Sequence, residues 1–176
     1  LLTQSGEIGY HGYNHQPLCP EGFNYSGDNY TGWPDKDNMR DSIKELARFG
    51  TSFLPDARFA AYVPPSNYLC PVGQEALLEA VPDIKTISGL YLPADGVAAH
   101  VQEFREEADG TISTPRITSG YSLDTYNQLM MAKNLLLHGV VSHFIHPDDV
   151  LDDERGAMLG WSAMFSDFSA SVEQIK

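Results

Sequence analysis

Two histidines four positions apart are the residues whose type and spacing most strongly suggest chemistry. His11 and His15 stand in the segment Tyr-His-Gly-Tyr-Asn-His-Gln-Pro, directly after a short apolar run. At this spacing two side chains can face the same way on one helical turn or in a tight loop. Neutral imidazoles in that arrangement suit Zn²⁺ or a similar divalent ion. The alternative is a pair of solvated loop histidines, because the spacing alone is a weak motif.

Two more residues of interest follow extended segments. His146 ends the apolar run from Val140 to His146, which predicts a position at the mouth of a strand. An imidazole placed there near a carboxylate can donate a proton near neutral pH. The alternative is a capping residue bonded to Asp148 or Asp149. Arg116 could pair with a catalytic aspartate, or it could form an ordinary structural ion pair.

Aromatic and amide side chains form a third group. Aromatic faces stack on sugar rings and amides bond hydroxyl groups, although aromatic residues are equally common in protein cores. The candidates for lining a sugar groove are Asn67, Tyr68, Tyr91 and Tyr121.

The elements that must position these residues alternate between apolar runs and helical patterns, which predicts an α/β fold. The expected strands are Glu7 to His11, Arg58 to Val63, Ile84 to Leu92 and Val140 to His146. The expected helices start at Asp35 or Asp37, at Ala76, at the cap Ser122 and near Arg155. The first is expected to fade near Gly50 and the third to end at the cap pattern His138-Gly139. Asp109-Gly110 predicts a tight turn. The last helix is expected to bury Met158, Trp161, Phe165 and Phe168. In folds with covered parallel strands, ligands bind at the C-terminal ends of those strands.

Composition excludes several classes of function. The chain has 176 residues with 11 Lys and Arg against 24 Asp and Glu, a net charge of −13. This charge argues against a nucleic-acid partner and against docking on an anionic membrane. No apolar run is long enough to cross a membrane, and no glycine-rich loop indicates a nucleotide cofactor. Two cysteines, Cys19 and Cys70, could form one bridge, but two isolated thiols are the favoured interpretation.

Three segments resemble motifs of the polysaccharide deacetylase superfamily, in the same order along the chain. The His11 to His15 segment resembles its His-x-x-x-His metal motif. The segment Tyr62 to Tyr68, with Pro64-Pro65, resembles its groove-lining Arg-x-Pro loop, although the arginine is absent. Phe144 to Asp149 resembles its final strand motif. The segments Pro-Pro-Ser-Asn-Tyr and Pro-Arg-Ile-Thr-Ser-Gly-Tyr resemble sequences of a divergent bacterial branch of that superfamily.

The resemblance implies a partial or distorted (β/α)₇ barrel that lacks its first strand. Residues 1–176 would form a single domain and, because the chain opens without Met, a fragment of a longer protein. The family's paired aspartates end the first strand, which would precede Leu1. The resemblance also implies an extracellular or cell-envelope location.

The implied activity is hydrolysis of acetyl groups on a carbohydrate polymer by metal-activated water. His11 and His15 would hold the ion, with Zn²⁺ favoured and Co²⁺, Ni²⁺ or Fe²⁺ as alternatives. His146 would be the general acid and Arg116 a second catalytic residue. Pro65 would join the groove residues in binding the sugar.

Two other classes of function remain open. A glycoside hydrolase-like barrel would use paired carboxylates such as Asp124 and Asp148 without a metal. A non-catalytic barrel would keep the fold only to bind sugar.

Overall fold

The computed structural model describes residues 6–90 and 102–174. Tyr91, a candidate for the sugar groove, lies outside the described residues. Contacts divide the chain into two compact units, Leu1–Pro115 and Arg116–Lys176, and each unit is described by itself. The single domain expected from the sequence stays a prediction.

The first unit is built on a four-stranded sheet with the order β1-β2-β4-β3. Its strands are β1 (Ala61–Tyr62), β2 (Thr86–Gly89), β3 (Arg105–Glu106) and β4 (Ile112–Pro115). β1, β2 and β4 are parallel, and β3 pairs with β4 in the antiparallel sense. The expected turn at Asp109-Gly110 joins β3 to β4, with Gly110 at a φ of 82°. The expected Glu7 to His11 strand is reduced to a parallel bridge between Tyr10 and Tyr62.

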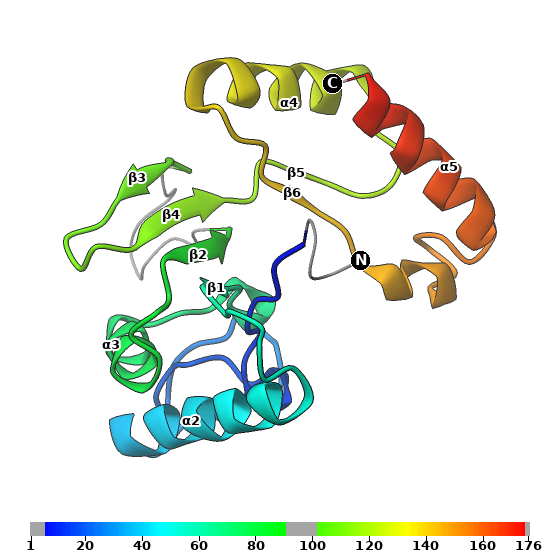
Figure 1. The fold of residues 1–176 in the computed structure, drawn as a ribbon. Helices are drawn as coiled ribbons and strands as arrows, with labels where there is room; N and C mark the ends of the chain where they lie inside the picture. The colour runs from blue at the N-terminus through cyan, green and yellow to red at the C-terminus, as the bar shows by residue number, and fades with distance from the viewer. Residues whose placement is uncertain (1–5, 91–101, 175–176) are drawn as a thin grey trace. The chain divides into compact units, whose positions relative to one another are not determined.

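Two α-helices of the first unit, α2 (Lys36–Phe53) and α3 (Pro71–Ala80), pack against each other (Figure 1). Asp35 caps α2 as expected, because its carboxylate accepts a hydrogen bond from the Asn38 amide at 2.8 Å. The helix continues past Gly50, where the sequence predicts its end. α3 starts earlier than the expected Ala76, with proline at its first position, where the missing amide hydrogen has no partner to lose.

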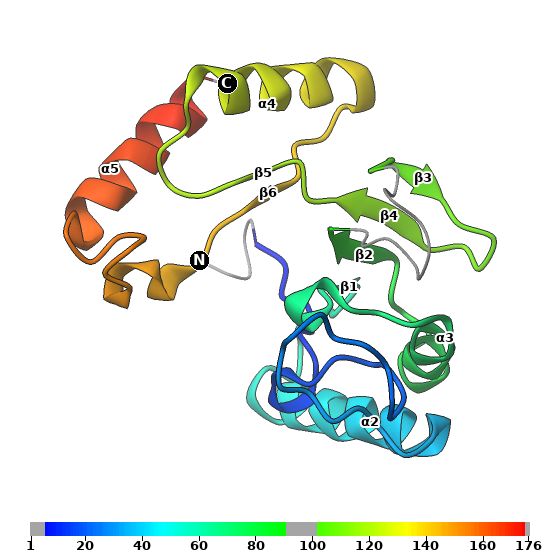
Figure 2. The same cartoon turned by 180° about the vertical axis from the view of Figure 1, so that it is seen from behind.

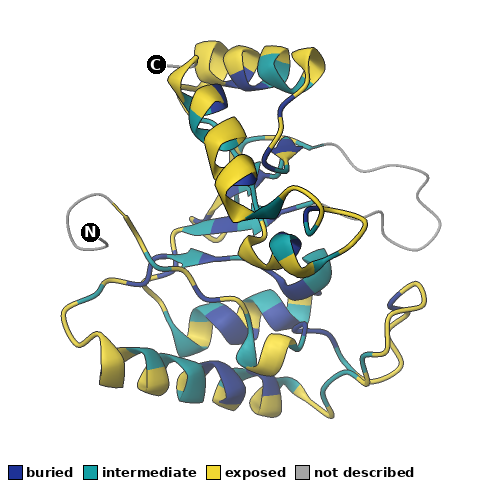
Figure 3. Cartoon of the chain, turned by 90° about the vertical axis from the view of Figure 1, so that its right-hand side faces the viewer, coloured by how far each residue is buried: buried dark blue, intermediate teal, exposed yellow. Residues whose placement is uncertain are grey.

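The core of the first unit lies between the sheet and these helices. Buried and exposed residues alternate along α2, as expected for an amphipathic helix (Figure 3). Gly73 on α3 is buried against Leu18, and a Cβ at this position would overlap the Leu18 carbonyl oxygen. The buried cluster comprises Tyr10, Leu18, Met39, Ile43, Phe59, Tyr62, Ala76, Leu77, Ile84 and Ile87.

A disulfide joins Cys19 to Cys70, with 5.1 Å between their Cα atoms. The favoured interpretation of two isolated thiols is therefore wrong. The reason is non-local: a parallel bridge between Leu18 and Leu69 aligns the two segments just before each cysteine. The bridge is packed against the buried Tyr25.

The second unit contains β5 (Thr118–Ser119), α4 (Thr125–His138), β6 (His143–Phe144), η3 (Pro147–Leu151) and α5 (Gly160–Glu173). β5 and β6 form a parallel pair, and both views show them side by side (Figures 1 and 2). α4 ends at Gly139, whose φ of 70° gives the expected C-terminal cap.

Two expectations for the second unit are wrong. The cap of α4 is Asp124 rather than Ser122, because the Asp124 carboxylate accepts the Asn127 amide hydrogen at 2.8 Å. α5 does not bury the expected stripe. Met158 precedes it and is 89% exposed, and Trp161 and Phe165 are exposed as well. The residues that α5 buries are Met164 and Ser171.

The architecture agrees with the α/β class at the level of parallel strands and helices. In the described ranges the strands form one four-stranded and one two-stranded sheet. The deacetylase-type barrel therefore stays a prediction. Across residues 6–90 and 102–174, no helix combines the length and apolar character that crossing a membrane requires.

The disulfide generates a stability prediction. Cys19 and Cys70 are 51 positions apart, so their bond closes a long loop and restricts the unfolded chain. Replacing both cysteines by Ala is expected to lower the free energy of unfolding by about 2–4 kcal/mol. Denaturant unfolding of the oxidised protein and of the double variant measures the difference. Reductant should destabilise the wild type to the same extent and leave the variant unchanged; equal stability of both proteins without reductant would contradict the prediction.

Candidate functional site

The backbone of the first unit brings the His11 segment to the end of β1. Tyr10 donates its amide hydrogen to Ala61 at 2.8 Å, and Val63 donates to the Tyr10 carbonyl at 2.9 Å. This pairing lets the His11 ring reach the Val63 carbonyl, with 2.7 Å between Nδ1 and the oxygen. A carbonyl only accepts, so Nδ1 carries the hydrogen, and in the neutral ring Nε2 presents a lone pair.

His15 ends the short helix η1 (Tyr13–His15) and lies beside His11. The two ring centroids are 4.8 Å apart, with the rings nearly perpendicular. The Tyr30 hydroxyl lies 2.9 Å from His15 Nδ1 and also 2.9 Å from the Ser66 hydroxyl. The structure thus brings together the two histidines predicted as metal ligands, and adds Tyr30 and Ser66, which sequence reasoning missed.

Backbone strain is concentrated around the same place. Asn14 and His15 in η1, and Ser66 and Asn67 in η2 (Pro65–Asn67), all have φ between 47° and 65°. Non-glycine residues in this region cost free energy, and such residues cluster at binding and catalytic sites. Gly12 allows the two turns to approach closely, because a Cβ at this position would lie 2.6 Å from Cγ of Pro65.

The predicted sugar-binding residues of the first unit have structural contacts. Pro65 is fully buried. The Asn67 side chain accepts the Leu90 amide hydrogen at 2.9 Å, and the Tyr68 hydroxyl donates to the Tyr25 carbonyl at 2.7 Å. Their contact with a sugar stays a prediction.

The second unit has a cleft of about 470 Å³. Tyr121, predicted to bind sugar, lines this cleft, and its hydroxyl donates to the His146 carbonyl at 3.1 Å. Among the residues that line it are Arg116, Tyr121, Phe144, His146, Asp149 and Arg155. The structure therefore gathers both predicted catalytic residues, Arg116 and His146, around one cleft.

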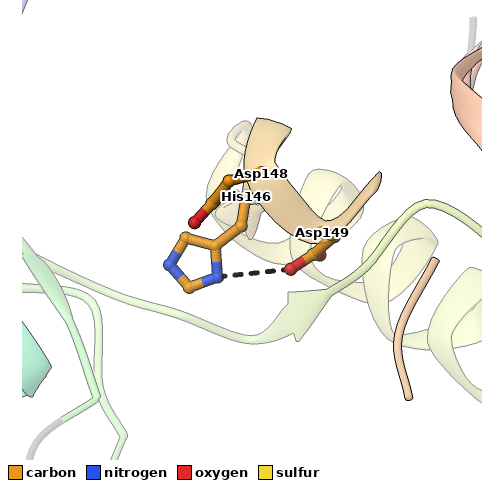
Figure 4. A group of neighbouring side chains, drawn as sticks. All are labelled: His146, Asp148 and Asp149. Carbon is orange, nitrogen blue, oxygen red and sulfur yellow. Dashed lines mark ion pairs between the residues drawn. The ribbon is translucent and has the colours of Figure 1, made fainter. Parts of the chain in front are cut away.

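His146 belongs to a network with Asp149 and Arg155. Figure 4 shows the His146 ring directed at the Asp149 carboxylate, with 3.8 Å between Nδ1 and Oδ1. Asp149 is buried, and its Oδ1 lies 2.6 Å from Nη1 of Arg155. Arg155 also donates to His146 Nδ1 at 3.4 Å. Because Nδ1 accepts this bond, the neutral His146 ring carries its hydrogen on Nε2.

The same network includes three side chains of the kind that bind metals. Ligand atoms of His146, Asp148 and Asp149 all lie within 4.8 Å of one another. The Arg155 guanidinium already neutralises Asp149, however, and its positive charge opposes a cation at this point. We interpret the cluster as an ion-pair network. In the part of the chain that the structure describes, no third His, Cys, Asp or Glu joins His11 and His15 in such a group.

Other candidate residues have structural roles. His143 is half-buried, with Nδ1 2.9 Å from the Thr118 hydroxyl and Nε2 donating to the Gly120 carbonyl at 2.8 Å. Burial lowers the pKa of His143. His143 is therefore a packed histidine. Asp124, considered above as half of a carboxylate pair, caps α4.

Comparisons with known proteins place the chain in a family. No curated protein and no solved structure matches it. A family described as uncharacterised proteins conserved in bacteria, DUF2194, matches residues 1–176. That match spans every element described above, and the chain belongs to the DUF2194 family of bacterial proteins.

Proposed function

We propose that the first unit binds a divalent metal ion through His11 and His15, and that the protein is a metal-dependent hydrolase of acetyl groups on carbohydrates. The observation that carries the metal site is the pair of adjacent imidazoles, each held by a contact at Nδ1. The acetylated carbohydrate rests on the resemblance to polysaccharide deacetylases.

The donor set suits the ion. With metal–nitrogen bonds of about 2.0–2.1 Å, two imidazoles that share a tetrahedral ion have centroids roughly 5 Å apart. The observed separation of 4.8 Å is close to that value. Zn²⁺ is the favoured ion, with Co²⁺, Ni²⁺ and Fe²⁺ as alternatives. When bound, the ion would supply an activated water and polarise the acetyl carbonyl.

The surrounding residues would orient the ligands. The Val63 carbonyl fixes the hydrogen of His11 on Nδ1, which directs coordination to Nε2. In our proposal His15 donates from Nδ1 to Tyr30, and Tyr30 donates to Ser66. A chain of this kind holds the ring angle and raises the basicity of the coordinating nitrogen.

His146 in the second unit is our proposed proton donor. As a general acid the ring would act in its protonated form, with a hydrogen on each nitrogen: Nδ1–H would face the Asp149 carboxylate 3.8 Å away in place of the bond from Arg155. The Nε2 hydrogen would then protonate a leaving group, and the ring would return to its neutral form. Arg155 and Asp149 act on this step through His146, as positioning residues.

A non-catalytic sugar-binding protein is the second candidate. It is favoured by the ligand count, because His11 and His15 have no third protein ligand among the described residues. The disulfide is consistent with either function in an oxidising compartment such as the cell envelope, where disulfides persist.

The metal site can be tested by removing one imidazole. His15→Ala is expected to abolish Zn²⁺ binding, measured by titration calorimetry, and to abolish release of acetate from an acetylated oligosaccharide. A chelator should have the same effect on the wild type, and added Zn²⁺ should restore the wild type but not the variant. The control is His138→Ala, a histidine in the last turn of α4. Zn²⁺ binding by the variant at wild-type strength would refute the site, and acetate release that persists in chelator would refute the mechanism.

Tyr30 provides a finer test. Tyr30→Phe keeps the ring and removes the hydroxyl between His15 and Ser66. The affinity for Zn²⁺ is expected to fall about 10–100-fold, the usual effect of losing a hydrogen-bond partner of a ligand. Tyr126→Phe, on an exposed side chain of α4, is the matched control. Unchanged affinity would mean that Tyr30 does not orient His15.

His146→Ala separates three roles in one protein. A general acid acts in the transition state, so kcat is expected to fall about 10²–10⁴-fold while Zn²⁺ content and melting temperature stay the same. Loss of Zn²⁺ together with activity would instead make His146 a metal ligand. A lower melting temperature with full turnover would make it a structural residue of the Asp149–Arg155 network.

A further inference from the structure

Arg116 differs from the other arginines in its surroundings. Its guanidinium is half-buried and lies over the Phe144 ring, with 5.0 Å between Cζ and the ring centroid. Among the described residues it has no carboxylate or hydrogen-bond partner. Four other arginines contact a carboxylate: Arg40, Arg48, Arg105 and Arg155. Arg58 has no carboxylate partner in the described ranges either, but it is exposed, where water compensates its charge.

This arrangement is unfavourable without a partner. The chain has 24 acidic and 11 basic residues, so carboxylates are abundant, yet none meets this cation within the described part of the second unit. Burying part of an unpaired charge costs free energy. The same burial lowers the pKa of Arg116, with no neighbouring carboxylate to oppose the effect. The ring of Phe144 compensates only a part of this cost.

The cleft beside Arg116 has room and the chemistry for an anionic sugar. Its 470 Å³ matches the size of a small-ligand site. Phe144 and Tyr121 give it aromatic walls, and Ser119 and Ser122 contribute hydroxyl groups. Of the two carboxylates that line it, Asp149 is neutralised by Arg155, and Asp167 is exposed, where it can accept hydrogen bonds from sugar hydroxyls.

We propose that this cleft binds the carboxylate of an acidic glycan, with Arg116 as the residue that recognises the charge. A guanidinium matches a carboxylate with two parallel hydrogen bonds, and the half-buried position strengthens both. The glycan part of this assignment rests on the proposed function, while the carboxylate part rests on Arg116 and the cleft alone. The substrate class that follows is a uronate-containing polymer.

The test compares trigalacturonate with its methyl ester, which has the same shape without the charge. Binding is measured by calorimetry on the whole chain in the presence of a chelator, so that the metal site does not contribute. The charged probe is expected to bind at least about tenfold more tightly than the ester, which is the size of a hydrogen bond to a charged group. Arg116→Gln should remove that preference, and Arg116→Lys should keep part of it. Arg58→Gln, which removes the exposed unpaired arginine, should keep all of it.

The outcomes separate this proposal from the proposed function. Equal binding of both probes, no binding of either, or an intact preference in Arg116→Gln overturns the anion site. None of these results bears on release of acetate from a neutral acetylated oligosaccharide, which tests the hydrolase. Circular dichroism of Arg116→Gln shows whether the variant is folded. If it is not, the folded Arg116→Lys variant decides, because a preference of undiminished size in that protein also overturns the proposal.

Discussion

The backbone pairing between Tyr10 and β1 is the interaction on which the candidate site of the first unit depends. It consists of two hydrogen bonds, to Ala61 and from Val63. They align the chain after Tyr10 with the chain after Tyr62, so that the His11 loop and the Pro65 loop leave β1 at the same end. Two contacts of the site follow from this alignment: the bond from His11 to Val63 and the close approach of Gly12 to Pro65. This placement is the one that parallel α/β folds give to ligand sites.

The parts of the structure that could be predicted from the sequence are those that local interactions decide. The cap at Asp35, the turn at Asp109-Gly110 and the end of α4 at Gly139 each depend on residues within one turn of chain. Where two local choices competed, as between Ser122 and Asp124, the sequence pattern offered no way to choose. The observed strands are also shorter than the apolar runs that predict them. An apolar run indicates which residues can be buried, but it does not indicate how many of them pair with a neighbouring strand.

The parts that could not be predicted depend on contacts between distant positions. Tyr30 reaches Ser66 across 36 residues, and Cys19 reaches Cys70 across 51. The hydrophobic periodicity of a sequence does not indicate which distant residues contact each other. An acidic run such as Asp148 to Asp153 is typical of a solvated helix start, yet Asp149 is buried against Arg155. A signal was available, since a lone arginine two residues after that run is the cation that such carboxylates need. The effect of this arginine on the His146 ring could be seen only in the structure.

The net charge of the chain affects which ligands each unit can bind. A net charge of −13 attracts cations to the whole surface and repels polyanions. A divalent ion at His11 and His15 would therefore be favoured by the long-range field, even with only two neutral protein ligands. An acidic glycan would be opposed by it. At 0.1 M ionic strength, salt largely screens this repulsion between charges more than about 10 Å apart. Contacts in a half-buried cleft are screened far less. Recognition of an anion must then come from a charge close to the ligand. On so acidic a protein, the feature to expect is therefore a partly desolvated cation such as Arg116 and not a basic surface.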